Sequence, residues 1–243
     1  TTMTGWLVSL IGFKLNIGKV ILPFLALGGL GITFLKKETP ANFSKFLMGF
    51  SLLFLGLNYM KEGFEAFAMH FDFSFLNDKH PFLFILIGLL LAASLHSSSA
   101  SMMIFLSSLS AEVISLQQAI YLVIGADMGT TITALIATIN GNSIRQKVGY
   151  SQFFFNLFTM ILTLLMMNVY RYIIIDMMGI SDPLIALVTF HSTMNAVGIL
   201  CLLPLIGYFT KFINKMVVHK EDKLARNIML VNPEESHAAI EAL

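Results

Sequence analysis

The fold is decided by a nearly uncharged segment, residues 81–144, which reads PFLFILIGLLLAASLHSSSASMMIFLSSLSAEVISLQQAIYLVIGADMGTTITALIATINGNSI. Its only charged residues are Glu112 and Asp127, yet two clusters of small polar residues interrupt it, HSSSAS at 96–101 and GADMGTTIT at 125–133. Each apolar piece between them is shorter than the roughly 20 residues that a spanning helix needs. The pieces are Phe82–Leu95, Met102–Leu109, Ala119–Ile124 and Leu135–Ile139. This pattern predicts re-entrant hairpins or discontinuous helices, in which protein or a water-filled cavity satisfies the exposed backbone.

The composition of the whole chain agrees with a membrane protein. Of its 243 residues, 56% are hydrophobic and only 12% are charged, about half of the roughly 25% charged residues of a soluble domain. Such a composition excludes a disordered protein and a basic nucleic-acid-binding domain. The single cysteine, Cys201, excludes a disulfide within the chain.

Outside residues 81–144, four apolar stretches end at charged residues and predict helices across the bilayer. They are Val20–Leu35, Phe46–Met60, Phe153–Tyr170 and Leu184–Phe209. Leu, Ile, Phe, Met and Gly dominate these stretches without alternation, which argues against a transmembrane β-barrel. We therefore predict an all-α polytopic membrane protein, with helices linking two repeats at 20–80 and a repeat with broken helices at 81–215.

Charge placement predicts the orientation. Lysine and arginine are in excess in the loops after residues 35 and 144 and after the last span, whereas acids dominate the loops 61–80 and 171–183. Because basic loops stay in the cytoplasm, we expect a multi-pass protein of the cell membrane with a cytoplasmic C-terminus. The segment 81–144 must then cross the bilayer a net odd number of times. A hairpin at the serines followed by a broken span, or the reverse order, satisfies this equally well.

The serine cluster Ser97–Ser99 is the first candidate binding site. Hydroxyls and backbone amides can donate to an oxyanion, and hydroxyl oxygens can bind a small hard cation. At a helix start, free N–H groups and the helix dipole favour an anion. Serines in membrane helices also serve close packing alone, and the adjacent His96 could titrate near neutral pH or act as a neutral hydrogen-bonding group.

The second candidate is the segment Gly125–Thr133. Gly125 and Gly129 permit an unwound backbone whose carbonyls could bind a cation. Asp127 is an intramembrane acid, which indicates function unless it lies at an interface near a helix end. The third is the segment Phe190–Asn195, FHSTMN, with a similar polar residue pattern at Gln152–Asn156, although polar side chains in spanning helices often only hold helices together.

The start of the chain resembles its own middle. Thr1-Thr2-Met3-Thr4-Gly5 aligns with Thr130-Thr131-Ile132-Thr133-Ala134, and each copy continues into an apolar stretch and a glycine. The charges place the two copies in opposite orientation, as in an inverted-topology repeat. We therefore expect residues 1–19 to be the tail of a first repeat whose earlier half is missing.

The SSSA at 97–100 followed by GADMGTTIT at 125–133 resembles the sodium/phosphate cotransporter family, the type II sodium-dependent phosphate transporters and their bacterial relatives. The resemblance covers roughly residues 1–215 and implies an inverted-repeat transporter. Two residues depart from the family pattern, because His96 stands where glutamine is usual and Asp127 where asparagine is frequent. Residues 216–243 resemble the start of the cytoplasmic helical region of bacterial members.

The resemblance implies a sodium-coupled inorganic phosphate transporter that works by alternating access, without enzymatic activity and without a cofactor besides the coupling sodium ion. It implies phosphate binding by His96, Ser97, Ser98 and Ser99, and sodium binding by Asp127, Thr130, Thr131, Thr133, Thr2 and Thr4. Supporting polar contacts would come from Asn156, Ser192, Asn195 and Gln152. The expected partners are phosphate, sodium, the lipid bilayer, the missing half of the first repeat and, as an open question, a second copy in a homodimer; nucleic acid is not expected. A channel for anions or cations and a membrane phosphate sensor are the alternatives.

Overall fold

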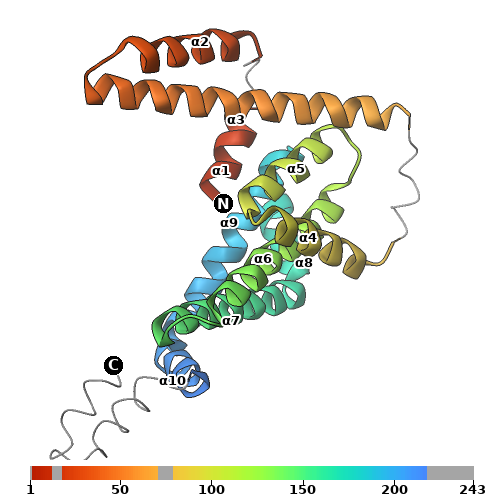
Figure 1. Ribbon diagram of the computed structural model, residues 1–243. Coiled ribbons are helices and arrows are strands. Elements are labelled where there is room, and N and C mark those ends of the chain that lie inside the picture. The colour runs from red at the N-terminus through yellow and green to blue at the C-terminus, as the bar shows by residue number, and fades with distance from the viewer. Residues whose placement is uncertain (1, 13–17, 71–78, 218–243) are drawn as a thin grey trace, which may run out of the picture.

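The computed structural model describes residues 2–12, 18–70 and 79–217, and helices make up the regular structure of these ranges (Figure 1). The helices are α1 (Thr2–Leu7), η1 (Val8–Gly12), α2 (Gly18–Phe34), α3 (Glu38–Ala68), α4 (Pro81–Leu95), α5 (Ser98–Ser110), α6 (Leu116–Thr138), α7 (Ser143–Leu165), α8 (Met167–Arg171), η3 (Tyr172–Met177), α9 (Pro183–Leu202), η4 (Leu203–Leu205) and α10 (Ile206–Met216). The predicted cytoplasmic region from residue 218 onward and Thr1 lie outside the described residues.

Within the described residues, four helical stretches are long and apolar enough to cross a membrane, which confirms an all-α polytopic membrane protein. They are Glu38–Ala66, Leu116–Thr138, Ser143–Leu165 and Pro183–Met216. Two of them contain the spans predicted at 46–60 and 184–209, and Ser143–Leu165 overlaps the span predicted at 153–170 but ends at Leu165. The last two begin at strong caps, since the side chain of Asn142 accepts from the N–H of Arg145 and Asp182 accepts at the start of α9.

The stretch predicted as a span at residues 20–35 forms helix α2, which has 17 residues with an apolar part at Ile21–Phe34. This is shorter than the four candidate spans, at the lower end of the roughly 17–25 residues of spanning helices. Helix α2 packs along α3 as one arm of a helical hairpin (Figure 1). The contact is close, because a β-carbon on Gly28 would lie 2.9 Å from the backbone nitrogen of Met48.

The predicted break at the serines is present. Helix α4 ends at Leu95, His96 takes a left-handed conformation with φ 50°, and Ser97 is extended and caps α5. With 15 and 13 residues, α4 and α5 are too short to span. They form a hairpin with the serines at its tip. Of the two orders left open by the charges, the structure therefore has the hairpin before the span.

The predicted unwinding at Gly125 and Gly129 is wrong, because α6 is continuous from Leu116 to Thr138. The two glycines serve close packing of α6 against α4. A β-carbon on Gly125 would collide with the carbonyl oxygen of Ile85, and one on Gly129 with that of Leu89. Gly125 lies against Ile85 and Gly129 against Leu89, so residue numbers increase in the same direction along both helices. Helices α4 and α6 therefore run parallel. Small residues that let helix backbones approach are a common packing device in membranes.

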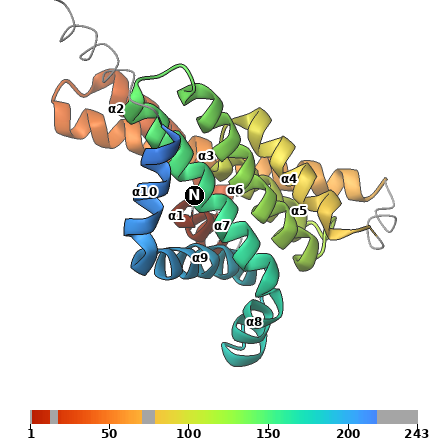
Figure 2. The ribbon, with the colours of Figure 1, turned by 90° about the horizontal axis from the view of Figure 1, so that it is seen from below.

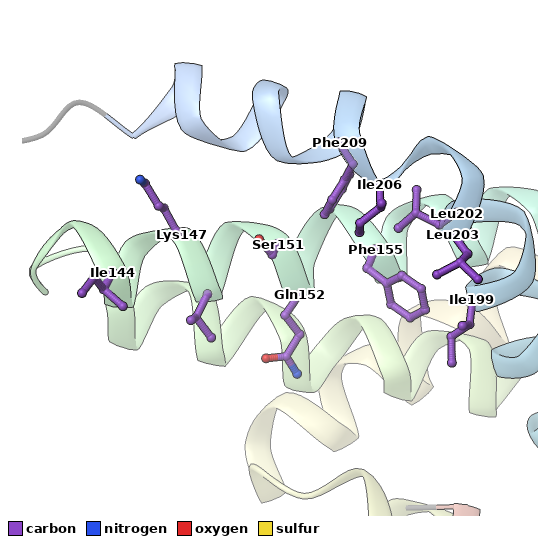
Figure 3. Close-up of a pocket in the computed structure, with 11 residues that line it drawn as sticks. Ile144, Lys147, Ser151, Gln152, Phe155, Ile199, Leu202, Leu203, Ile206 and Phe209 are labelled. Carbon is purple, nitrogen blue, oxygen red and sulfur yellow. The ribbon is translucent and has the colours of Figure 1, made fainter.

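Helix α7 lies between two groups of helices, with α4, α5 and α6 on one side and α10 on the other (Figure 2). After α9, Pro204 lies in the short helix η4, and the chain then turns back along α7 as α10 (Figure 3). The ring of Phe212 on α10 meets the ring of Phe154 on α7 edge-on, with centroids 5.0 Å apart. This contact fixes α10 against α7.

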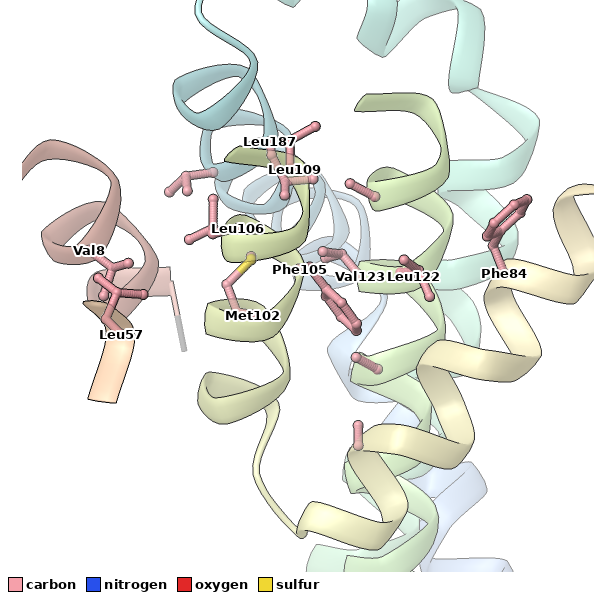
Figure 4. Packing of buried hydrophobic residues seen from close by; sticks show 14 of the residues in the cluster. Val8, Leu57, Phe84, Met102, Phe105, Leu106, Leu109, Leu122, Val123 and Leu187 are labelled. Carbon is pink, nitrogen blue, oxygen red and sulfur yellow. The ribbon is translucent and has the colours of Figure 1, made fainter. Parts of the chain in front are cut away.

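The main core forms where α5 packs against α6, α9 and the N-terminal helices α1 and η1 (Figure 4). Phe105 and Leu106 of α5 are buried there with Leu122 of α6, Leu187 of α9 and Val8. Although 13 residues long, α5 therefore touches three separate parts of the chain. Its position is set by packing on all sides, which keeps the serine-bearing end in a defined place.

Candidate functional site

The turn between α4 and α5, residues 96–99, is called the serine turn below. The Ser97 hydroxyl accepts the N–H of Ala100 at 3.2 Å, and the Ser97 carbonyl accepts the Ser101 hydroxyl at 3.0 Å. Ser97, Ser98 and Ser99 are half-buried, whereas His96 is exposed. The first residues of α5 are therefore partly accessible to a ligand. The first turn of a helix is where backbone N–H groups have no intrahelical partner.

A second group of polar side chains forms around Asp127, in the middle of α6. Nε2 of His191, on α9, lies 3.1 Å from Oδ2 of Asp127, and the side chains are 2% and 17% exposed. An ionised carboxylate only accepts hydrogen bonds, so Nε2 carries the proton when Asp127 is charged. Nδ1 of the same ring is buried without a hydrogen-bond partner among the described residues. The contact ties α6 to α9 through a buried polar pair.

Helix α7 completes this group through Asn156. Its amide nitrogen donates to the carbonyl oxygen of Asp127 at 3.0 Å and also contacts the Thr131 hydroxyl. The hydroxyls of Thr131 and Thr130 donate to the same carbonyl at 2.7 and 3.3 Å. We call Asp127, Thr130, Thr131, Asn156 and His191 the Asp127 cluster. Thr133 donates to the Thr130 carbonyl at 2.9 Å, one turn further along α6.

The parallel packing of α4 and α6 sets the height of the serine turn relative to the Asp127 cluster. A β-carbon on Gly129 would lie 3.0 Å from the backbone nitrogen of Ala93, so these two residues are level. The serine turn begins a few residues beyond Ala93. At 1.5 Å per residue, it is level with the turn of α6 that follows Gly129 and carries Thr131 and Thr133, whereas Asp127 lies about 8 Å earlier along α6.

The chemistry of the Asp127 cluster suits a small hard cation. Each threonine hydroxyl gives its proton to a backbone carbonyl, so its oxygen can accept or bind a cation, although the Thr131 oxygen also accepts from Asn156. With the carboxylate of Asp127 these are the oxygen ligands that hard cations prefer. Among the described residues, no group of three or more His, Cys, Asp or Glu side chains could hold a metal ion. The cluster therefore differs from the nitrogen- and sulfur-rich sites of zinc or copper.

The other predicted site residues lie elsewhere. Ser192 contacts α1, because its hydroxyl accepts the indole N–H of Trp6 at 2.8 Å. Asn195 donates to the carbonyl of His191 within its own helix at 2.9 Å. Gln152 is exposed in a groove between α7 and α10, and Thr4 lines a groove between α1 and α3. Thr2 is half-buried at the start of α1.

Sequence reasoning named His191 only within the polar segment Phe190–Asn195, without its partner Asp127, and it missed Trp6. A signal for the first was present, since Asp127 and His191 are titratable residues inside apolar segments and such residues tend to pair. The sequence separation of 64 residues hid the partner. No comparable signal marked Trp6, although it is the only tryptophan of the chain.

Comparisons with known proteins agree with these features. The profile described as Na+/Pi-cotransporter matches residues 1–62 and 74–203, which is most of the chain. The chain belongs to the Na+/Pi-cotransporter family. It is also similar to the uncharacterized protein YqeW of Bacillus subtilis (strain 168), with 30% identity over 136 residues that cover 56% of this chain and 44% of the relative. The chain thus matches less than half the length of this relative. No solved structure matches it.

Proposed function

We propose that the protein is a sodium-coupled transporter of inorganic phosphate that works by alternating access around the serine turn and the Asp127 cluster. Membership in the Na+/Pi-cotransporter family supports the two substrates. The observation that carries the residue roles is the oxygen-rich Asp127 cluster on α6, whose Thr131 is near the level of the start of α5. In this proposal Ser97, Ser98 and Ser99 bind phosphate, and Asp127, Thr130, Thr131 and Thr133 bind sodium.

Electrostatics gives the physical reason for coupling. Moving a phosphate anion into the low dielectric of a membrane protein is costly unless charge or hydrogen bonds compensate it. Residues 81–144 contain no lysine or arginine. Helix N-terminal amides and a nearby sodium ion must therefore offset the charge. Sodium bound at Asp127 lowers the free energy of phosphate at the serine turn, and by linkage phosphate strengthens sodium binding equally.

The geometry also supports a movable site. The serine turn is the tip of a hairpin that does not span, and His191 and Asn156 attach α6 to two different helices. Alternating access requires one group of helices to rock against another around a fixed site. The α4–α5 hairpin with α6 would form one such group and α7 with α9 the other. In this proposal the C-terminus lies in the cytoplasm, as the basic residues of α10 predict.

The test is uptake of labelled phosphate by the full-length protein in proteoliposomes, under an inward sodium gradient. The proposal expects saturable accumulation against a gradient, lost when potassium replaces sodium. Asp127→Asn should raise the half-saturating sodium concentration at least tenfold, while Asp176→Asn, at an exposed position, should leave it unchanged. Ser98→Ala should raise the half-saturating phosphate concentration with little effect on sodium.

Three results would contradict the proposal. Wild-type behaviour of both Ser98→Ala and Asp127→Asn would remove the residue roles. Unsaturable flux that never exceeds equilibrium would favour the channel alternative. Phosphate binding without net movement would favour a membrane sensor.

A further inference from the structure

The groove between α7 and α10 has no role in the transport proposal (Figure 3). It has a volume of about 620 Å³, within the roughly 300–1,000 Å³ of small-ligand sites. Apolar side chains from α7, α9, η4 and α10 line almost all of it. These include Val148, Phe155, Ile199, Leu203, Ile206 and Phe209. Such walls suit a hydrocarbon chain.

One end of the groove is basic. Helices α7 and α10 run in opposite directions, so the end of α10 lies beside the start of α7 (Figure 3). Lys147 lines the groove at this end, and its amine points toward α10. Arg145 precedes it on α7, and Lys211 and Lys215 are exposed on α10. Neither helix contains an acidic residue.

The sequence of α10 places this end at a membrane surface. Ile206, Phe209, Ile213 and Met216 recur at the spacing of one helical face, while Lys211 and Lys215 lie on the opposite face. Lysine side chains near the end of a membrane helix typically reach the headgroup region of the bilayer. Clustered lysines next to a spanning helix attract anionic lipids.

We propose that this groove binds one anionic phospholipid, with an acyl chain between α7 and α10 and its phosphate headgroup at Lys147. The charge complementarity selects the occupant, since a zwitterionic lipid would fit the walls but gain less at the basic end. This inference does not depend on which ion the protein transports.

The test is native mass spectrometry of the purified full-length protein, loaded with equal amounts of palmitoyl-oleoyl phosphatidylglycerol and phosphatidylcholine. We expect retention of one phosphatidylglycerol in preference to phosphatidylcholine. Lys147→Gln should weaken phosphatidylglycerol retention about fivefold, the effect expected for one lysine near an anionic headgroup, and Lys147→Arg should restore it. Lys45→Gln, an exposed lysine on α3, is the matched control.

A second variant tests the groove itself. Ser151→Phe would place an aromatic ring among the lining side chains and should remove the retained lipid whatever its headgroup. Thr210→Phe, at an exposed position of α10 outside the lining, should not. Equal retention of the two lipids by the wild type would overturn the proposal, as would equal losses in Lys147→Gln and Lys45→Gln. Full retention in Ser151→Phe, or a groove already covered by another part of the full-length protein and inaccessible to lipid, would also overturn it.

Discussion

Two polar motifs interrupt the apolar segment 81–144. The helix ends at one of them and continues through the other. At the serine turn the helix stops, because His96 adopts a left-handed conformation and Ser97 caps a new helix. At Gly125–Thr133 the helix continues, although the motif contains two glycines and three threonines. The difference shows that glycine in a membrane helix does not by itself break it. A break needs a residue that reverses the chain and a cap that satisfies the next helix.

Packing explains why α6 stays continuous. Gly125 and Gly129 lie against backbone carbonyls of α4, so unwinding there would lose a close helix contact. The threonines give their protons to carbonyls within the helix, and Asn156 adds a bond from α7. The motif can thus present oxygens to a ligand from an intact helix. Four substitutions test this difference between the two motifs.

Gly125→Ala should have the largest effect. The new β-carbon would collide with the carbonyl of Ile85, a backbone atom that moves only if α4 and α6 separate. We expect a loss of about 3 kcal/mol in the free energy of unfolding, at the upper end for overpacking, and a lower Tm in detergent. Gly63→Ala on α3 meets nothing within 4 Å and should be neutral or slightly stabilising, since alanine favours helices. Equal Tm values for the two variants would contradict the packing role of Gly125.

Asn156→Ala should have the next largest effect. It removes a hydrogen bond between α7 and α6, and such bonds between membrane helices contribute about 0.6–1.7 kcal/mol. We expect a loss of stability in that range together with weaker sodium dependence of uptake. Asn195→Ala removes an amide whose bond stays within its own helix and should cost less. A larger effect for Asn195 would shift the important contact from α6 to α9.

Ser97→Ala tests the cap at the break. The Ser97 hydroxyl accepts the N–H of Ala100, and loss of such a cap costs about 1 kcal/mol. Ser94→Ala is the matched control, because the Ser94 hydroxyl bonds the Leu90 carbonyl within α4 and its loss should be smaller. Thermal unfolding in detergent measures both. A cost for Ser94→Ala that equals the cost for Ser97→Ala would mean that the cap is not what stabilises the start of α5.

His96→Gly should have the smallest effect, and the opposite sign. A left-handed conformation costs a residue other than glycine about 1–2 kcal/mol, and glycine loses about 0.5–1 kcal/mol in conformational entropy. The net expectation is stabilisation by about 0.5–1 kcal/mol with an unchanged break. Destabilisation, or a loss of phosphate affinity, would indicate that the exposed imidazole has a role beyond the turn.

The amino-acid sequence alone was enough to predict a membrane protein, its family and the positions of both polar motifs. Apolar segment length and sparse charge are local properties, and they follow from what a bilayer accepts as a helix. Capping signals are local too, so the break at the serines was predictable. The packing of α2 along α3 was not predictable in the same way, because it depends on which helix faces meet.

Whether the helix unwinds at Gly125 and which residue pairs with Asp127 depend on the tertiary structure. A glycine suits unwinding and close approach equally well, and the choice depends on whether another helix lies against it, here Ile85 and Leu89 of α4. Asp127 and His191 are 64 residues apart, and their contact exists because α6 and α9 pack side by side. Hydrogen bonds between helices depend on which faces meet, and a single sequence does not specify those faces.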